Sequence, residues 1–131
     1  MNLTEEQKIK VVARFEKMVD TFSGHPEFIN ILLKMCEVHN DKSNDYASDE
    51  SPFANIELCE KGGVSAWKGV IIRLGDKYSR LLNAMSGKLL KCEAVEDAFI
   101  DNACYSIIGL IEYLRFKKDN NEEEKVENKT S

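Results

Sequence analysis

The sequence predicts an all-α protein, most simply a four-helix bundle with one short additional helix. Apolar side chains recur every three or four residues in four long segments, which is the spacing that lines one face of a helix. No segment alternates between apolar and polar residues for long enough to build a sheet. Glycine and proline residues separate the periodic segments, as expected where helices end and begin.

The first two helices are expected on either side of Gly24. Thr4 followed by Gln7 has the pattern of a capping box, so the first helix should begin there. Pro26 suits the first position of the second helix, because proline lacks the amide hydrogen that this position leaves unpaired. From residue 40 to 51 the sequence NDKSNDYASDES shows no apolar period, which predicts a loop.

A short helix and two long helices complete the predicted bundle. Ser51 and Pro52 have the residue types of an N-cap and a first helical residue, and the Gly62-Gly63 pair should end this short helix. The third long helix is expected from about residue 64 to 85, with Gly87 after its end.

The fourth helix should run from about Glu93 to Phe116. Residues 1–117 would then form a single helical domain. Residues 118–131 are polar and of low complexity, which predicts a disordered tail.

Composition excludes several classes of function. The 131 residues carry a net charge of −5, which argues against an extended surface for nucleic acid and leaves room only for a local basic pocket. No apolar run approaches the length of about 18 residues that a membrane span needs, and the sequence does not start like a signal peptide. We therefore expect no membrane partner and a cytoplasmic location.

The run RLGDKYSR places four charged residues on one helix face. Arg73, Asp76, Lys77 and Arg80 are spaced by three and four residues, so their side chains stack along the helix. This stripe fits three interpretations: a solvated ladder of ion pairs, a set of salt bridges to another subunit, or the wall of a site for a charged ligand.

Two pairs of carboxylates have the spacing of a metal site. Asp97 and Asp101 lie four residues apart, where like charges repel unless a cation lies between them. Glu57 and Glu60 form an ExxE pair on the short helix. Carboxylates from facing helices, completed by water and a ligand phosphate, suit Mg²⁺, although such pairs are also common on solvated faces.

The predicted loop and the short helix contain further polar residues that could bind a ligand. Lys42, Asp45 and Tyr46 could hold a nucleotide, with the Tyr46 ring stacked on a base, or they could simply be solvated. Asn55 is an amide on the surface of the short helix.

Four stretches, taken in order, resemble a known family: HNDKSNDYA, SPFANIE, GVSAWKGVIIRLGDKYSRL and VEDAFIDNACYSII. Together they are similar to the nucleotide-modification-associated domain of phages and bacteria, which is itself similar to the MazG-like all-α nucleoside triphosphate pyrophosphatases. The resemblance covers roughly residues 28 to 115. Its specific parts are the patterns K-x-x-DY, IRL-x-DK-x-x-R and ED-x-x-x-D-x-x-x-Y.

The resemblance implies a MazG-like fold, nucleotide binding with Mg²⁺, and conversion of a (d)NTP to its monophosphate and pyrophosphate. It also implies a homodimer or homotetramer, and a place in the host cytoplasm if a phage encodes the chain. The sequence departs from the pyrophosphatases in one respect, because no ExxD follows the ExxE pair. This departure concerns hydrolysis more than nucleotide binding, so the alternative is a non-catalytic phage protein that sequesters a nucleotide or a nucleotide-derived defence signal. A third class is a helical interaction protein without a ligand.

The resemblance also implies roles for individual residues. The expected phosphate-binding residues are Lys42, Arg73, Lys77 and Arg80. The residues expected at the base and sugar are Asp45, Tyr46 and Asn55. The pool from which metal ligands would come is Glu57, Glu60, Asp76, Asp97 and Asp101.

Overall fold

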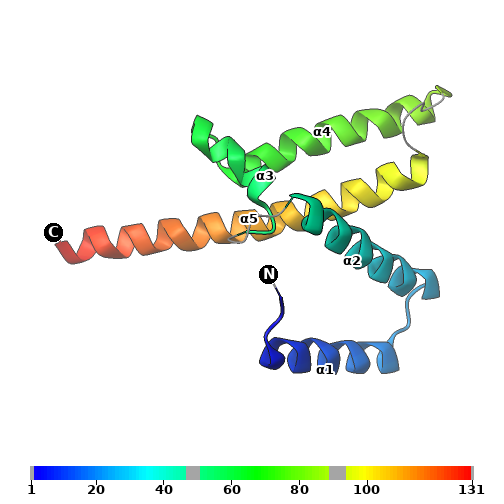
Figure 1. Cartoon of the computed structure of the whole chain (residues 1–131), viewed down its shortest axis with the longest axis horizontal. Coiled ribbons are helices and arrows are strands. Elements are labelled where there is room, and N and C mark those ends of the chain that lie inside the picture. The colour runs from blue at the N-terminus through cyan, green and yellow to red at the C-terminus, as the bar shows by residue number, and fades with distance from the viewer. Residues whose placement is uncertain (1, 47–50, 89–93, 131) are drawn as a thin grey trace. The chain divides into compact units, whose positions relative to one another are not determined.

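The computed structural model describes residues 2–46, 51–88 and 94–130, and every regular element in these ranges is a helix. The prediction of an all-α protein is therefore confirmed. In chain order the elements are α1 (Glu5–Thr21), α2 (Pro26–Tyr46), α3 (Ala54–Glu57), the 3₁₀ helix η1 (Leu58–Gly62), α4 (Ala66–Met85) and α5 (Val95–Thr130) (Figure 1). None of these helices combines the length and the apolar character that crossing a bilayer requires.

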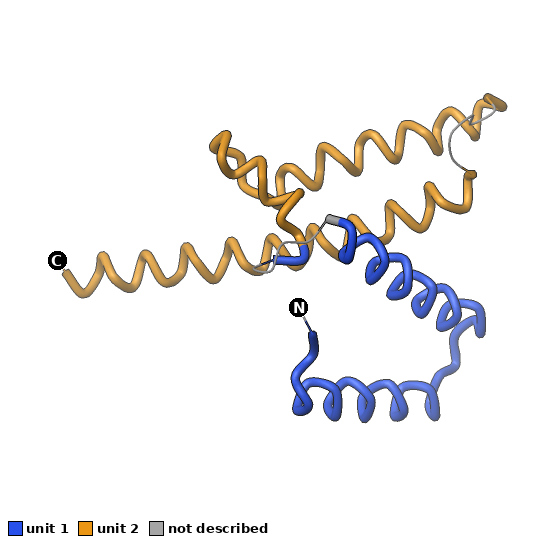
Figure 2. Tube along the Cα trace, viewed as in Figure 1, with its two compact units in different colours: residues 1–52 blue, residues 53–131 orange. Residues whose placement is uncertain are grey.

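The chain divides into two compact units (Figure 2), and the single domain expected over residues 1–117 stays a prediction. Unit 1 comprises Met1–Pro52 and contains α1 and α2. Unit 2 comprises Phe53–Ser131 and contains the remaining helices. The structure therefore does not establish a single bundle of four helices.

The start of α1 has the predicted capping box. The Gln7 amide donates to the Thr4 hydroxyl at 3.2 Å, and the Thr4 amide donates to Gln7 Oε1 at 2.9 Å. Each bond satisfies an amide that has no partner within the helix, which is why this pair of residue types marks a helix start so reliably.

Helix α2 begins at Pro26 as predicted, but it continues to Tyr46. The predicted loop from residue 40 is therefore wrong over residues 40–46, whereas residues 47–50 lie outside the described part of the chain. The polar residues Asn, Asp and Ser cost a helix only a few tenths of a kcal/mol each. Without a glycine or proline to stop it, a helix that has already formed can extend through them.

Unit 2 is built on α4 and α5, which lie side by side and run in opposite directions (Figure 1). Val70 of α4 is fully buried and packs in a cluster with Ile108 of α5. A Cβ added at Gly109 would come within 3.1 Å of a Val70 methyl group, so a glycine at this point lets the two helices approach closely. Trp67 of α4 packs edge-on against Tyr113 of α5, with ring centroids 5.4 Å apart.

Two of the three predicted boundaries around the short helix and α4 are confirmed. Gly63 ends η1 with φ of 80° and Gly87 follows α4 with φ of 84°, which are left-handed conformations that favour glycine. The predicted N-cap at Ser51 is wrong, because α3 starts at Ala54 after Phe53. The Phe53 ring is buried in the core cluster, and the Phe53 carbonyl accepts the first helical hydrogen bonds.

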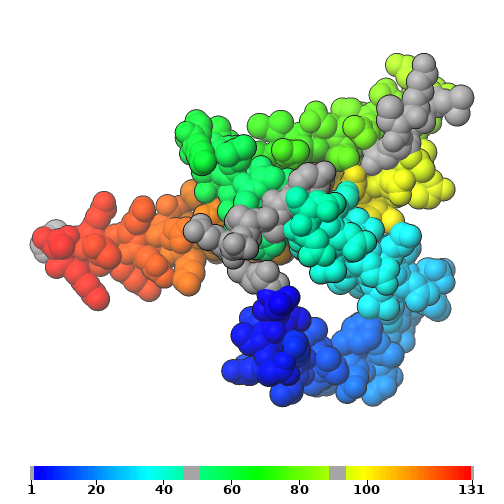
Figure 3. Space-filling model, in the orientation of Figure 1, coloured from blue at the N-terminus to red at the C-terminus, as the bar shows by residue number. Residues whose placement is uncertain are grey.

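Helix α5 starts at Val95, and the predicted start at Glu93 lies outside the described residues. The helix continues to Thr130, where the sequence analysis expects a disordered tail from residue 118. Figure 3 shows this last part, in orange to red, as a single helix without another segment of unit 2 packed on it in this view. Glutamate and lysine are good helix formers, and residues 117–130 contain neither glycine nor proline.

Candidate functional site

A groove in unit 2 lies between the α3–η1 segment and α4. Its cavity volume is about 530 Å³, within the range of small-molecule sites. The side chains of α3 and η1 that line it are Asn55, Ile56, Leu58 and Cys59. The residues of α4 that line it are Gly69, Ile72, Arg73 and Asp76.

Gly69 and Cys59 set the separation of the two walls of the groove. A Cβ built on Gly69 would lie 2.8 Å from Cys59 Sγ, closer than real atoms approach. The Cys59 thiol donates to the carbonyls of Ile56 at 3.2 Å and Val64 at 3.3 Å, which fixes the η1 turn. The absence of a side chain at residue 69 therefore allows η1 to lie directly on α4.

Three of the predicted site residues meet in this groove. Arg73 and Asp76 from the α4 stripe face it together with Asn55 from α3, and all three are exposed. Among the described residues, neither Arg73 nor Asp76 makes a side-chain hydrogen bond or an ion pair. A guanidinium in this situation can form two parallel hydrogen bonds to a phosphate, and a carboxylate can accept from hydroxyl or amino groups.

Lys77, the third member of the stripe, turns to α5 instead. Its ammonium lies 2.7 Å from Asp101 Oδ2, and the Asp101 residue is only 7% exposed. This cation removes the repulsion that the spacing of Asp97 and Asp101 predicts, since Asp101 is neutralised by its own partner. Asp97 itself is exposed, one turn before Asp101 on α5.

Arg80 is exposed on α4, two turns after Arg73, and interacts with another group of the protein. The nucleotide-binding residues expected in unit 1 lie on the end of α2 and not on a loop. Lys42 and Asp45 are exposed there, and the side chain of Tyr46 lies outside the described part of the structure.

A charge network around one buried carboxylate, which the sequence does not predict, lies further along α5. Glu112 is 1% exposed, and its Oε2 accepts a hydrogen bond from Arg115 Nε at 2.8 Å and forms an ion pair with Arg115 Nη2 at 2.7 Å. Arg115 Nη2 also donates to Glu60 Oε1 at 2.6 Å, and the amide of Ala66 donates to the same oxygen at 3.3 Å. Arg115 thus connects α5 to η1 and to the start of α4.

The network perturbs the ionisation of its members. Burial raises the pKa of the Glu112 carboxyl, and the nearby Glu57 carboxyl raises it further, against the lowering effect of Arg115. Burial alone would lower the pKa of Arg115, but its hydrogen bonds to Glu112 and Glu60 outweigh that effect and raise it. The one signal in the sequence is a Glu within the apolar run IIGLIEYL, followed three residues later by an Arg.

The expected metal ligands do not meet at one place: Asp76 lines the groove, and the others lie along α5 or beside it. Glu57 and Glu60 lie at the Glu112–Arg115 network, whereas Asp101 lies at Lys77. Residues 101 and 112 are eleven positions apart, so these places are separated by about 16 Å of helix. In the described ranges, no three or more His, Cys, Asp or Glu side chains are grouped so that they could hold a metal ion. The Mg²⁺ site stays a prediction.

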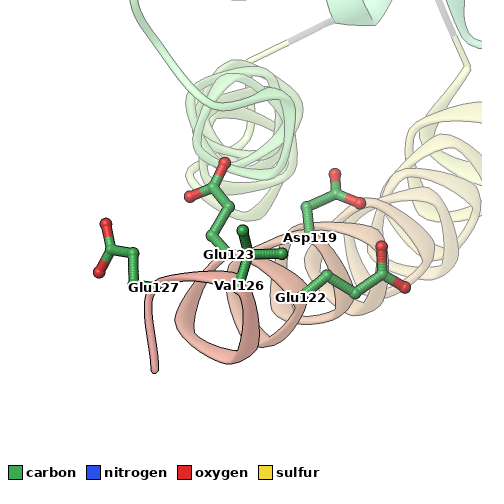
Figure 4. Close-up of a pocket in the computed structure, with 5 residues that line it drawn as sticks. All are labelled: Asp119, Glu122, Glu123, Val126 and Glu127. Atoms are coloured by element: carbon green, nitrogen blue, oxygen red, sulfur yellow. The ribbon is translucent and has the colours of Figure 1, made fainter. Parts of the chain in front are cut away.

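A second hollow lies near the C-terminal end of α5 (Figure 4). Its lining consists of Asp119, Glu122, Glu123, Val126 and Glu127. Its lining holds four carboxylates and no cation, so this hollow would repel a phosphate.

No family model, curated protein or solved structure matches the chain. The fold and the groove thus define the class only broadly: an all-α protein in which an arginine, a carboxylate and an amide share one groove with apolar side chains.

Proposed function

We propose that unit 2 binds a nucleotide, or a small molecule derived from one, in the groove between α3–η1 and α4. The observation that carries this proposal is Arg73, whose guanidinium lines the groove and has no partner among the described residues. A guanidinium can donate two parallel hydrogen bonds to a phosphate, as it can to a carboxylate. The resemblance of the sequence to the nucleotide-modification-associated domain supports the same ligand class.

The remaining lining fits the rest of such a ligand. Asp76 can accept hydrogen bonds from sugar hydroxyls or base amino groups, and the amide of Asn55 can both donate and accept. The exposed side chains of Leu58 and Ile72 supply apolar surface for the flat face of a base. We propose Arg73 as the phosphate ligand and Asn55 and Asp76 as the residues at the base and sugar.

Retention of the ligand is favoured over its hydrolysis. Asp101 is paired with Lys77, and Glu60 is paired with Arg115, so two carboxylates of the expected metal pool already have cations of this chain beside them. The (d)NTP pyrophosphohydrolase implied by the resemblance remains the second candidate. In that case Asp76 is the groove carboxylate that would hold Mg²⁺ together with a ligand phosphate, because Mg²⁺ often takes only one or two protein carboxylates.

We also propose that the protein is a homodimer or homotetramer in the cytoplasm, or in the host cytoplasm if a phage encodes it. Helix α5 carries a second apolar stripe at helical spacing, apart from the residues that pack on α4. Its exposed members are Ile107, Leu110, Ile111 and Leu114. Apolar stripes of this kind commonly mark association surfaces. Analytical ultracentrifugation of the parent and of a Leu110→Glu/Leu114→Glu variant tests it: a smaller species is expected for the variant, and a monomeric parent contradicts it.

Titration calorimetry with a panel of nucleoside mono-, di- and triphosphates, with EDTA and with Mg²⁺, tests the proposed function. Product analysis of every ligand that binds then separates the candidates. Bound ligand that stays intact in the presence of Mg²⁺ supports retention, and release of monophosphate and pyrophosphate supports hydrolysis. A panel without any binding contradicts the proposal.

A further inference from the structure

The position of Lys77 on α4 would allow it to act as a second cation at the groove. It follows Arg73 by four residues, so both side chains leave the same helix face about 6 Å apart along the axis. An unrestrained Lys77 ammonium could thus stand beside the Arg73 guanidinium and contact a neighbouring phosphate.

Asp101 holds Lys77 away from that position. The two side chains are 2.7 Å apart across the α4–α5 interface and are only 20% and 9% exposed. An ion pair that excludes this much water is harder to open than a surface pair, because each charge would lose its partner before it regained water. Binding a phosphate with Lys77 would require this ion pair to open.

The charged residues that line the groove therefore suit an anion with a single phosphate group. Its lining contains one cation, Arg73, and one anion, Asp76. One guanidinium matches one phosphate group, whereas the further phosphates of a triphosphate would meet no cation of the groove and would lie near the Asp76 carboxylate. Arg80 is two turns further along α4 and is not among the residues that line the groove.

We propose that Asp101 is a positioning residue that sets the number of phosphates: by holding Lys77, it makes the groove a site for ligands with a single phosphate group, such as nucleoside monophosphates. This inference rests on the proposed function and adds to it the class of nucleotide. The selectivity applies without divalent cations, which would themselves neutralise a polyphosphate.

The test compares phosphate counts on one nucleoside at a time. The mono- and triphosphates of adenosine, guanosine, cytidine and thymidine are titrated into the full chain in EDTA by calorimetry. For every nucleoside that binds, the monophosphate is expected to bind at least as tightly as the triphosphate. Asp101→Asn removes the carboxylate that Lys77 contacts, and it is expected to raise the affinity for the triphosphate about tenfold relative to the monophosphate.

Lys77→Gln is the matched variant if Asp101→Asn does not fold. Because Lys77 is not a ligand in the parent, this variant should keep monophosphate affinity within about twofold, while a tenfold loss overturns the inference. A parent that prefers the triphosphate tenfold, with binding that Arg73→Ala removes, overturns the inference and leaves the proposed function intact. If no nucleotide binds the parent, the proposed function fails and this inference with it.

Discussion

The carboxylate of Glu112, almost completely buried on α5, accepts a hydrogen bond from Arg115 Nε, one turn further on, and forms an ion pair with the same guanidinium. The same guanidinium reaches Glu60 on η1, so a single cation balances two carboxylates from different elements. This contact fixes the η1 segment, which forms one wall of the groove. The stability of the network therefore bears directly on the proposed site.

The raised pKa of Glu112 makes stability depend on pH. A carboxyl whose pKa lies above its usual 4.5 in the folded protein binds its proton more tightly there than in the unfolded chain. Its favourable contribution is complete below the unfolded pKa and is lost as pH rises through the folded pKa. Urea unfolding across that window should show a smaller loss with rising pH for Glu112→Gln than for the parent. The control is Glu122→Gln, which removes an exposed carboxylate. If the unfolding free energy of Glu112→Gln changes with pH as steeply as that of the parent, Glu112 is not the source of the pH dependence.

Arg115→Met should destabilise the protein by about 2 to 3 kcal/mol. The change leaves the buried Glu112 carboxylate without the Arg115 cation. The expected loss of stability is smaller than for a fully buried ion pair, because Arg115 is 41% exposed. The double variant Arg115→Met/Glu112→Leu should recover most of the loss, since an apolar pair can replace a buried ion pair. Chemical denaturation measures both, and a double variant no more stable than the single one speaks against the network.

Gly69→Ala should destabilise unit 2 and weaken ligand binding in the groove. The added methyl group overlaps Cys59 Sγ, and overpacking costs about 1 to 3 kcal/mol. Gly75→Ala on the same helix is the matched control, because its Cβ meets nothing within 4 Å and should stabilise α4 by about 1 kcal/mol. Cys59→Ala in the Gly69→Ala background should relieve the overlap. Thermal melts that rank Gly69→Ala and Gly75→Ala as equal would refute the close approach.

Truncation after Lys117 should leave the melting temperature within about 2 °C, the scale of a surface change. Residues 118–130 are helical, but apart from the half-buried Asn120 they are exposed, and the ion pair from Arg115 to Asp119 is long at 4.0 Å. Circular dichroism of the truncated chain should show a lower helix content and an unchanged melting temperature. A drop of several degrees would mean that this segment packs.

Local signals in the sequence predict the helix ends well. The capping box at Thr4 and Gln7 and the left-handed turns at Gly63 and Gly87 depend on residues only a few positions apart, so the residue types alone indicate them. The ends of α2 and α5 are missed because polar composition resembles that of a loop or a tail, although it does not prevent a helix.

The site is predicted in part for a similar reason. Arg73 and Asp76 share a helix face, so their convergence follows from helical spacing. The partners of Lys77 and Glu60 lie 24 and 55 residues away along the chain, and helical spacing carries no information about such pairs. For the same reason, the sequence places all the carboxylates in one pool, whereas α5 separates them.

The most direct test of the central claim is the contribution of Arg73 to nucleotide affinity. The parent and Arg73→Ala are titrated calorimetrically with the tightest ligand of the nucleotide panel, next to Arg14→Ala, which removes an exposed arginine from α1 in unit 1. Loss of the guanidinium should weaken binding at least tenfold, about 1.4 kcal/mol, with unchanged helix content, while Arg14→Ala binds like the parent. Equal affinities for the parent and Arg73→Ala would contradict the assignment of the groove as the nucleotide site.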